Sequence, residues 1–212
     1  QQPLAIHNCP SRRPLATFRL YNKYFQFYLT NQIVLSLARS DYAMNGGDYF
    51  EVRSSPTTLD EADSPTMLWN DMSQQNGLTH ERSQVQWKDI KDSSSNTYLI
   101  AEKYVPIDFY LDGRDVGDNE TMYSGDDLDL IRFTGIVGAI KAGDRDNGPK
   151  RDRSILKAEG SYVQWFGGPH ANCFNMAFCD GSVRAVSYSI DLDAHRRLGN
   201  RADGDVVDLN RL

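Results

Sequence analysis

The sequence predicts an α+β domain over residues 1–212 that is mostly antiparallel β-sheet, with short helices and long loops. Eleven Tyr and nine Phe favour strands over helices. Several short segments alternate apolar and polar residues, which is the pattern of half-buried strands. An Asp-Gly pair at 180–181 separates two such segments, and this is the strongest short-range signal for a β-hairpin.

Residues 1–105 predict strands joined by polar loops. The first 14 residues contain three prolines and predict an extended entry segment. The expected strands lie within 15–38, at 85–90 and at 97–105. A short helix is expected over 67–72, with Ser64 as its cap and Pro65 at its first position. Glu102 lies within the last strand, where it points to solvent, pairs with an arginine, or is an inward carboxylate that organises a turn or a metal ion.

The segment 108–129 is strongly acidic, and Arg114 is its one basic residue. Its carboxylates fall into two clusters of oxygen ligands suited to Ca²⁺, which takes six to eight oxygens in a flexible geometry. The first cluster is Asp112, Asp115, Asp118 and Glu120 with Asn119, and the second is Asp126, Asp127 and Asp129. Neither cluster has the spacing of an EF-hand loop, so a solvated acidic face is the alternative to calcium. A buried strand at 131–140 and an exposed loop at 141–154 are expected to follow.

The region around residue 180 carries the clearest pattern. The core face of a predicted strand at 172–179 carries Phe174, Met176 and Phe178. We expect a type I′ turn at Asp180-Gly181, with positive φ at both residues. A two-residue turn would bring Val183 and Ala185 of the return strand at 182–190 to the same core face.

The hairpin is flanked by a histidine on one side and by a short helix on the other. His170 follows Gly-Gly-Pro at the strand entrance, and we expect a structural histidine that hydrogen-bonds a carbonyl or a carboxylate. Nine residues separate it from Asp180, so we do not expect the two to form a catalytic pair. Helical turns are expected over 191–198, with Gly199 as the C-cap, and a short strand at 206–207.

The three cysteines, Cys9, Cys173 and Cys179, contain no C-x-x-C pair, which argues against a structural zinc site. Cys173 and Cys179 would lie roughly 20 Å apart on one strand. A disulfide needs Cα atoms within about 7 Å of each other, so these two cannot bond. One of them is a candidate partner for Cys9, and the other would be free or bonded to a segment outside this chain. A reactive catalytic thiol is the alternative.

Composition and the missing motifs limit the function. The net charge of −6 excludes a nucleic-acid partner, because phosphate binding needs a basic face. No apolar run reaches the roughly 20 residues of a membrane span, and the chain begins with Gln1, so we expect a processed or truncated product. No phosphate loop, G-x-S-x-G or H-E-x-x-H motif is present. Trp69, Trp87 and Trp165 would either pack in the core or line a concave binding patch. Asn119 begins an N-glycosylation sequon and is a possible modification site.

The chain resembles the H-x9-D-G prepilin-like proteins abundant in planctomycete-type bacteria. His170 followed after nine residues by Asp180-Gly181 matches the signature that names them. Further segments fit in order along the chain, namely Cys9–Arg13, Asp41–Gly46, Ser95–Lys103, Gly125–Asp129 before Ile131-Arg132, Phe166–His170, Phe178–Arg184 and Arg201–Val207. Such proteins are related to type IV pilins and type II secretion pseudopilins.

The resemblance implies an exported protein, extracellular or at the cell surface, with a pilin-like globular head. The leader and the hydrophobic N-terminal helix of that family are absent here, so any membrane contact would come through that missing helix. We therefore expect a non-enzymatic structural subunit of a pilin-like filament, with copies of itself as partners. The alternatives are a secreted module that binds carbohydrate or protein, with a calcium-ordered acidic loop, and a hydrolase built on His170. Pseudopilin heads can carry calcium, which is the one cofactor that the resemblance supports.

Overall fold

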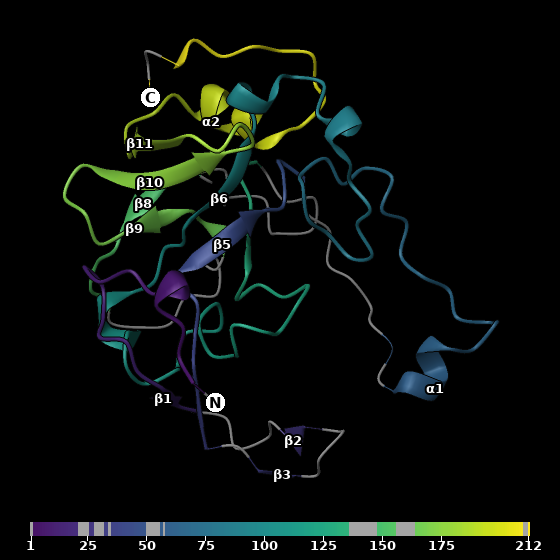
Figure 1. Ribbon diagram of the computed structural model, residues 1–212, viewed down its shortest axis with the longest axis vertical. Helices are drawn as coiled ribbons and strands as arrows, with labels where there is room; N and C mark the ends of the chain where they lie inside the picture. Colours follow the sequence, from purple (N-terminus) through teal and green to yellow (C-terminus); the bar gives the residue numbers. More distant parts are fainter. Residues whose placement is uncertain are drawn as a thin grey trace.

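The computed structural model describes residues 2–20, 26–27, 32–33, 35–49, 56, 58–135, 148–155, 164–209 and 212. Within these ranges the chain forms one five-stranded sheet, three two-stranded sheets and two short α-helices (Figure 1). The α+β, mostly β class predicted from the sequence is confirmed. Among the described residues, every helix is too short or too polar to cross a bilayer.

The five-stranded sheet has the order β11-β10-β6-β5-β7. Its strands are β5 (Tyr42–Asn45), β6 (Tyr98–Glu102), β7 (Ile131–Arg132), β10 (Cys173–Phe178) and β11 (Val183–Ser187). Neighbouring strands are antiparallel except β5 and β7, which are parallel. The strand predicted at 97–105 is confirmed as β6.

Shorter elements surround this sheet. The two-stranded sheets pair β1 (Phe18–Arg19) with β4 (Ser36–Leu37), β2 (Gln26–Phe27) with β3 (Gln32–Ile33), and β8 (Lys150–Arg151) with β9 (Gly167–Gly168). The α-helices are α1 (Leu59–Ala62) and α2 (Leu192–Gly199), and the 3-10 turns are η1 (Ala5–His7), η2 (Trp87–Asp89), η3 (Ser94–Asn96) and η4 (Ile107–Phe109). The expectation of strands within 15–38 is confirmed for the described residues of that range.

The turn between β10 and β11 is not the predicted type I′ turn. Gly181 has a φ of 83°, but Asp180 does not have a positive φ. The Phe178 carbonyl accepts a hydrogen bond from the Gly181 amide at 3.0 Å, and the Phe178 amide donates to the Ser182 carbonyl at 2.8 Å. This pattern is a three-residue loop closed by a residue in the left-handed region, where glycine carries no steric penalty.

One residue of register decides which side chains of β11 reach the core. Phe174 pairs with Val186, and both are fully buried. Val183 and Ala185, which the two-residue turn would have buried, are exposed instead. The predicted core face of β10 is confirmed, whereas that of β11 is wrong, because a shift of one residue turns every side chain to the opposite face.

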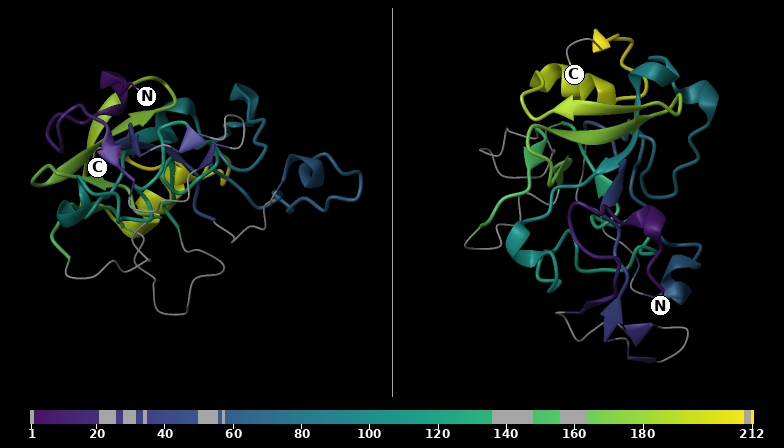
Figure 2. Two further views of the ribbon diagram at one scale, coloured as in Figure 1. Left: turned by 90° about the horizontal axis from the view of Figure 1, so that it is seen from below. Right: turned by 60° about the vertical axis from the view of Figure 1, so that its left-hand side comes forward.

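The core lies between the sheet and α2, which Figure 2 shows stacked against β10 and β11. Its buried residues are Tyr98, Ala101, Phe166, Phe174, Met176, Phe178, Val186, Ile190 and Leu198. The helix predicted over 191–198 is confirmed, and the Asp191 carboxylate caps it by accepting the Ala194 amide at 2.9 Å. The prediction of Gly199 as the C-cap is wrong, because Gly199 is the last helical residue and Asn200 is the C-cap. Close packing explains the glycine, since a Cβ there would lie 1.9 Å from Thr134 Oγ1.

Two central segments differ from their predictions. The strand predicted at 85–90 is wrong, because the Asp89 carboxylate accepts the Gln86 amide at 2.8 Å and closes the turn η2. The helix predicted at 67–72 is also wrong. The helix of this region is α1, where Thr58 provides the N-cap, and it lies away from the sheets (Figure 1).

The C-terminal half differs at three places. No strand forms at 206–207, where the Val207 amide donates to Asn96 Oδ1 at 3.2 Å instead of to a ladder partner. Of the strand predicted at 131–140, residues 131–135 are described, and only β7 (Ile131–Arg132) among them is strand; residues 136–147 lie outside the described residues. The loop expected to be exposed through residue 154 instead forms β8 and buries Asp152.

His195 of α2 should make the protein less stable in acid. Burial lowers the pKa of this histidine to about 3, against an ordinary value near 6.5. Between these values the unfolded chain binds a proton that the folded chain does not, so His195 reduces stability as the pH falls from 6.5 toward 3. We expect the free energy of unfolding, measured in urea, to fall between pH 6 and 4 in the wild type. In His195→Phe its slope against pH should be shallower by about 1.4 kcal/mol per pH unit.

The comparison with the variant is needed because other groups titrate in the same window. Burial raises the pKa of Glu120 to about 7 and that of Asp115 to about 6, and these shifts reduce stability as the pH rises. Phenylalanine is the chosen substitution because the imidazole ring packs edge-on against Phe166 and Phe174. Parallel stability curves for the wild type and the variant would contradict the prediction.

Candidate functional site

Three reactive side chains meet at one end of the central sheet. Glu102 ends β6, His170 lies between β9 and β10, and Cys9 belongs to the N-terminal segment. Glu102 Oε1 lies 2.9 Å from His170 Nε2, and it accepts a hydrogen bond from Cys9 Sγ at 3.2 Å. One candidate ligand atom from each residue lies within 4.8 Å of the other two. We refer to these three residues as the Cys9–Glu102–His170 cluster.

The Glu102 carboxylate is held in place from the neighbouring strand. Its Oε2 accepts a hydrogen bond from the backbone N–H of Asn175 at 2.7 Å and another from the side-chain Nδ2 of Asn175 at 3.3 Å. The hydroxyl of Tyr188 donates to the carbonyls of Gly168 at 2.9 Å and His170 at 3.2 Å, which fixes the loop that carries the histidine. Of the alternatives for Glu102, the structure shows the inward carboxylate that organises a turn.

The cluster is buried on one side and open on the other. Cys9 and Glu102 are buried, whereas the His170 side chain is 30% exposed. Burial, reinforced by the hydrogen bond and charge of Glu102, raises the pKa of Cys9 to about 11. Burial also raises the pKa of Cys179 to about 11. Thiols that stay protonated at neutral pH are not activated nucleophiles, so the reactive-thiol alternative gains no support from these two cysteines.

All three cysteines are free thiols in the structure. Cys173 begins β10 and Cys179 follows its end, which agrees with the expected separation of the two along one strand. The Sγ of Cys9 is directed at Glu102 rather than at either of the other cysteines. The candidate disulfide from Cys9 is therefore not formed here.

A buried ion network adjoins the cluster and contains the two residues after Ser11. Arg12 pairs with Asp41 at 3.3 Å and with Asp152 at 2.9 Å. Arg13 pairs with Asp41 at 2.7 Å and with Asp118. All five side chains are buried. The entry segment, expected to be simply extended, is thus fastened to the sheet region by two buried guanidinium groups.

The acidic stretch does not act as one unit. Asp118 accepts from Arg13 Nη2 at 2.9 Å and lies 3.0 Å from Lys103 Nζ, whereas Asp112 pairs with Arg114 near the surface. The other acidic residues divide by burial: Asp115 and Asp129 are buried, Glu120 and Asp127 are half-buried with Asn119, and Asp126 is exposed. Among the described residues, the group whose ligand atoms converge for a metal is the Cys9–Glu102–His170 cluster. Calcium binding by the acidic stretch stays a prediction.

The H-x9-D-G residues divide between the cluster and the hairpin. His170 Nε2 lies 2.9 Å from the Glu102 carboxylate, which is a partner of the kind expected for this histidine. Asp180 and Gly181 form the turn, where Asp180 Oδ1 accepts the Ser182 amide at 2.8 Å. Strand β10 lies between His170 and this turn, so the motif does not form a histidine–aspartate pair.

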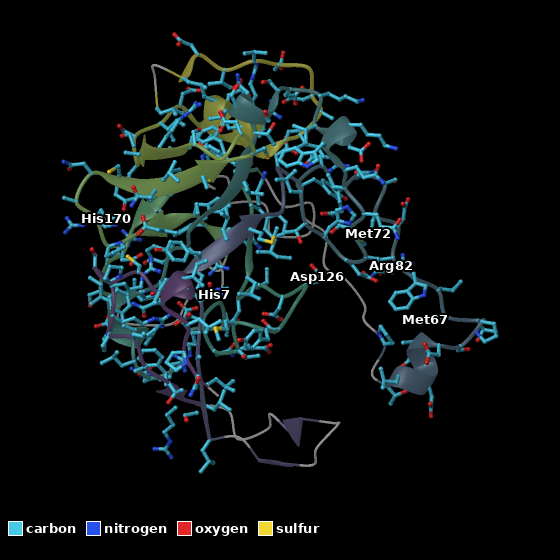
Figure 3. The ribbon with its side chains drawn as sticks, viewed as in Figure 1. His7, Met67, Met72, Arg82, Asp126 and His170 are labelled. Atoms are coloured by element: carbon cyan, nitrogen blue, oxygen red, sulfur yellow. The ribbon has the colours of Figure 1, made fainter. Side chains whose placement is uncertain are left out.

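A cavity of about 490 Å³ has Tyr42 in its lining, and Tyr42 pairs with Glu102 across β5 and β6. Its lining includes His7, Tyr42, Met44, His80, Arg82 and Asp126. Figure 3 shows His170 at the left of the view and Arg82 at the right. The three tryptophans are not part of this lining: Trp165 packs on Tyr104, Trp69 lies under Arg82, and Trp87 is 72% exposed.

Sequence reasoning missed the roles of Cys9, Arg12 and Arg13. The ion-pair and hydrogen-bond partners of their side chains lie 28 to 140 residues away, so no local spacing connects them. One signal was present, because Cys9–Arg13, Asp41–Gly46 and Ser95–Lys103 belong to the ordered set of motifs that carries the resemblance. These three segments are far apart in the sequence but meet at the Cys9–Glu102–His170 cluster and the adjoining ion pairs.

Comparison with known proteins gives one result at the level of the family. No curated protein and no solved structure matches the chain significantly. One family model matches residues 1–193, a range that contains both the Cys9–Glu102–His170 cluster and the β10–β11 hairpin. The chain therefore belongs to the family described as "Protein of unknown function (DUF1559)".

Proposed function

We propose that this chain is the globular head of a non-enzymatic structural subunit that assembles with copies of itself into a pilin-like or pseudopilin-like filament. The subunit would be exported by a bacterium and lie outside the cell or on its surface. The resemblance to H-x9-D-G prepilin-like proteins motivates the proposal. The buried attachment of the N-terminal segment is the structural observation that carries it.

In a filament bundled through N-terminal helices, tension passes from each helix into the head through the residues that follow the helix. Here those residues would include Arg12 and Arg13, which are buried against Asp41, Asp118 and Asp152. Breaking a buried ion pair by separating its partners costs roughly 3–5 kcal/mol, far more than an exposed pair. Such an attachment suits a head that must stay fixed to its stalk.

The edge of the five-stranded sheet offers a surface for contact between copies. β11 is the outermost strand on one side, and Val183 and Ala185 on it are exposed. An edge strand presents unpaired backbone groups to which another chain can add. This feature supports assembly, and the protonated thiols of Cys9 and Cys179 support the absence of catalysis by those groups.

Electron microscopy of native material, combined with cross-linking, tests the proposal. We expect ordered filaments, and in a Cys173→Ser background we expect Val183→Cys to form disulfide-linked dimers under mild oxidation. Val116→Cys is the matched control, because Val116 is also exposed but lies on the loop of the acidic stretch. Dispersed monomers at high concentration, with no cross-link from Val183→Cys, would show that the chain is not a filament subunit.

The second candidate is a secreted module that binds carbohydrate or protein. The cavity of about 490 Å³ favours it, because ligand sites usually occupy 300–1,000 Å³. This candidate predicts dispersed monomers that lose ligand binding when Arg82 at the cavity is replaced by alanine. Its calcium-ordered acidic loop is excluded if a chelator leaves the melting temperature unchanged.

A further inference from the structure

The Cys9–Glu102–His170 cluster unites three kinds of metal ligand from three separate segments. It joins a thiol of the N-terminal segment, a carboxylate at the end of β6 and an imidazole from the loop before β10. The sequence separations are 93 and 68 residues. A metal site whose ligands are this far apart in the sequence cannot be recognised from their spacing. The absence of a C-x-x-C pair therefore does not exclude zinc binding by these three residues.

The distances fit a tetrahedral ion. Zinc bonds of about 2.0–2.3 Å to nitrogen, oxygen and sulfur place neighbouring ligand atoms roughly 3.3–3.8 Å apart. Glu102 Oε1 lies 3.2 Å from Cys9 Sγ and 2.9 Å from His170 Nε2. These two pairs would move apart by only a few tenths of an ångström to admit an ion, and the ligand atoms of Cys9 and His170 lie within 4.8 Å of each other.

The groups around the cluster already hold the ligands in place. Two donors of Asn175 fix Glu102 Oε2, which leaves Oε1 directed at the other two ligands. The backbone amide of Cys9 donates to Asp41 Oδ2 at 2.7 Å, and Tyr188 fixes the His170 carbonyl. Such supporting hydrogen bonds orient ligands in metal sites and commonly change metal affinity by about 10–100-fold.

We propose that Cys9, Glu102 and His170 bind one zinc ion, with a fourth position that is open to solvent on the side of His170. Thiolate and imidazole ligands favour zinc over Ca²⁺ and Mg²⁺, which prefer oxygen ligands alone. On binding, zinc would take the place of the Cys9 thiol proton, which would be released to solvent. The partly exposed side of His170 gives the ion a path into the site. The ion would bind the N-terminal segment to the central sheet at a point next to the Arg12 and Arg13 ion pairs, whether or not the chain forms a filament.

Zinc titration of the untagged, EDTA-treated full chain tests the proposal. We expect one equivalent of Zn²⁺ to bind and to raise the melting temperature by roughly 5–10 °C when free zinc is about 100-fold above its Kd. An equal concentration of Mg²⁺ should leave the melting temperature unchanged, and any effect of Ca²⁺ should be the same in His170→Ala. Co²⁺ should bind in place of zinc and give a thiolate-to-cobalt charge-transfer absorption, which reports directly on Cys9.

Matched variants assign the effect to the three residues. His170→Ala and Cys9→Ser should weaken zinc binding by about tenfold or more. Cys173→Ser and His80→Ala should bind zinc like the wild type, because neither residue belongs to the cluster. His170 is partly exposed, so its variant should fold even if Cys9→Ser does not. The proposal is overturned if Co²⁺ gives no thiolate absorption, or if His170→Ala keeps the full zinc affinity.

Discussion

Replacing Asp118 with alanine should lower the free energy of unfolding by about 3–5 kcal/mol, because it leaves several buried cations without their shared partner. Asp118 lies 2.9 Å from Arg13, 3.0 Å from Lys103 and 3.7 Å from Arg39. Burial alone would raise the pKa of Asp118, but attraction by Arg13 and Lys103 outweighs burial and brings the pKa below its usual range. Urea unfolding at pH 7, followed by tryptophan fluorescence, measures the loss.

The matched control is Asp112→Ala, in the same acidic stretch. Asp112 pairs with Arg114, and both side chains are more than a third exposed, so the loss should stay below about 1 kcal/mol. If Asp118→Ala does not fold, Asp118→Asn should fold with a smaller loss, because it keeps the shape but not the charge. Similar losses of unfolding free energy for Asp112→Ala and Asp118→Ala would refute the buried network. They would favour the alternative that the acidic stretch is a solvated face.

Acid should weaken this network in a defined range of pH. The pKa of Asp118 is depressed in the folded chain, so its contribution is complete above the ordinary pKa near 3.9 and is lost as the pH falls below that value. His195 reduces stability in the range above, from pH 6.5 downward. The two effects therefore follow each other as the pH is lowered, and both lower the stability in acid, against the opposite contributions of Glu120 and Asp115.

The strand pattern was readable from the sequence because its period of two does not depend on partners. Phe174, Met176 and Phe178 were assigned to the core on that basis, and all three are fully buried. The register of the return strand was not readable, because it depends on whether the loop has two or three residues. The hydrogen bonds between Phe178 and Gly181 set that length, and Asp-Gly is compatible with both loops.

The candidate site was only partly predictable. The sequence placed Glu102 in a strand and left open whether its carboxylate points inward, and it expected His170 to bond a carbonyl or a carboxylate. Glu102 and His170 are partners because β6 and the loop before β10 lie side by side, and no local signal in the sequence indicates this. The burial of Arg12 and Arg13 was hidden for the same reason, since tertiary pairing overrides the usual exposure of arginine.

A pair of substitutions in the hairpin tests the core and its register together. Phe174→Ala should lower the free energy of unfolding by about 3–5 kcal/mol, since the ring is fully buried and lies stacked between Phe166 and Tyr188, with centroid distances of 6.3 and 6.1 Å. Val183→Ala, on the return strand, should change it by less than about 0.5 kcal/mol because Val183 is 67% exposed. Urea unfolding of both variants measures these losses.

Val186→Ala completes the test, because it separates the observed register from the one that a type I′ turn would impose. In the observed register Val186 is fully buried opposite Phe174, so its truncation should cost about 1.5–3 kcal/mol. In the alternative register Val183 would take the buried position and Val186 would face solvent. A larger loss of unfolding free energy for Val183→Ala than for Val186→Ala would therefore disprove the three-residue loop. A larger loss for Val186→Ala is the result that the three-residue loop predicts.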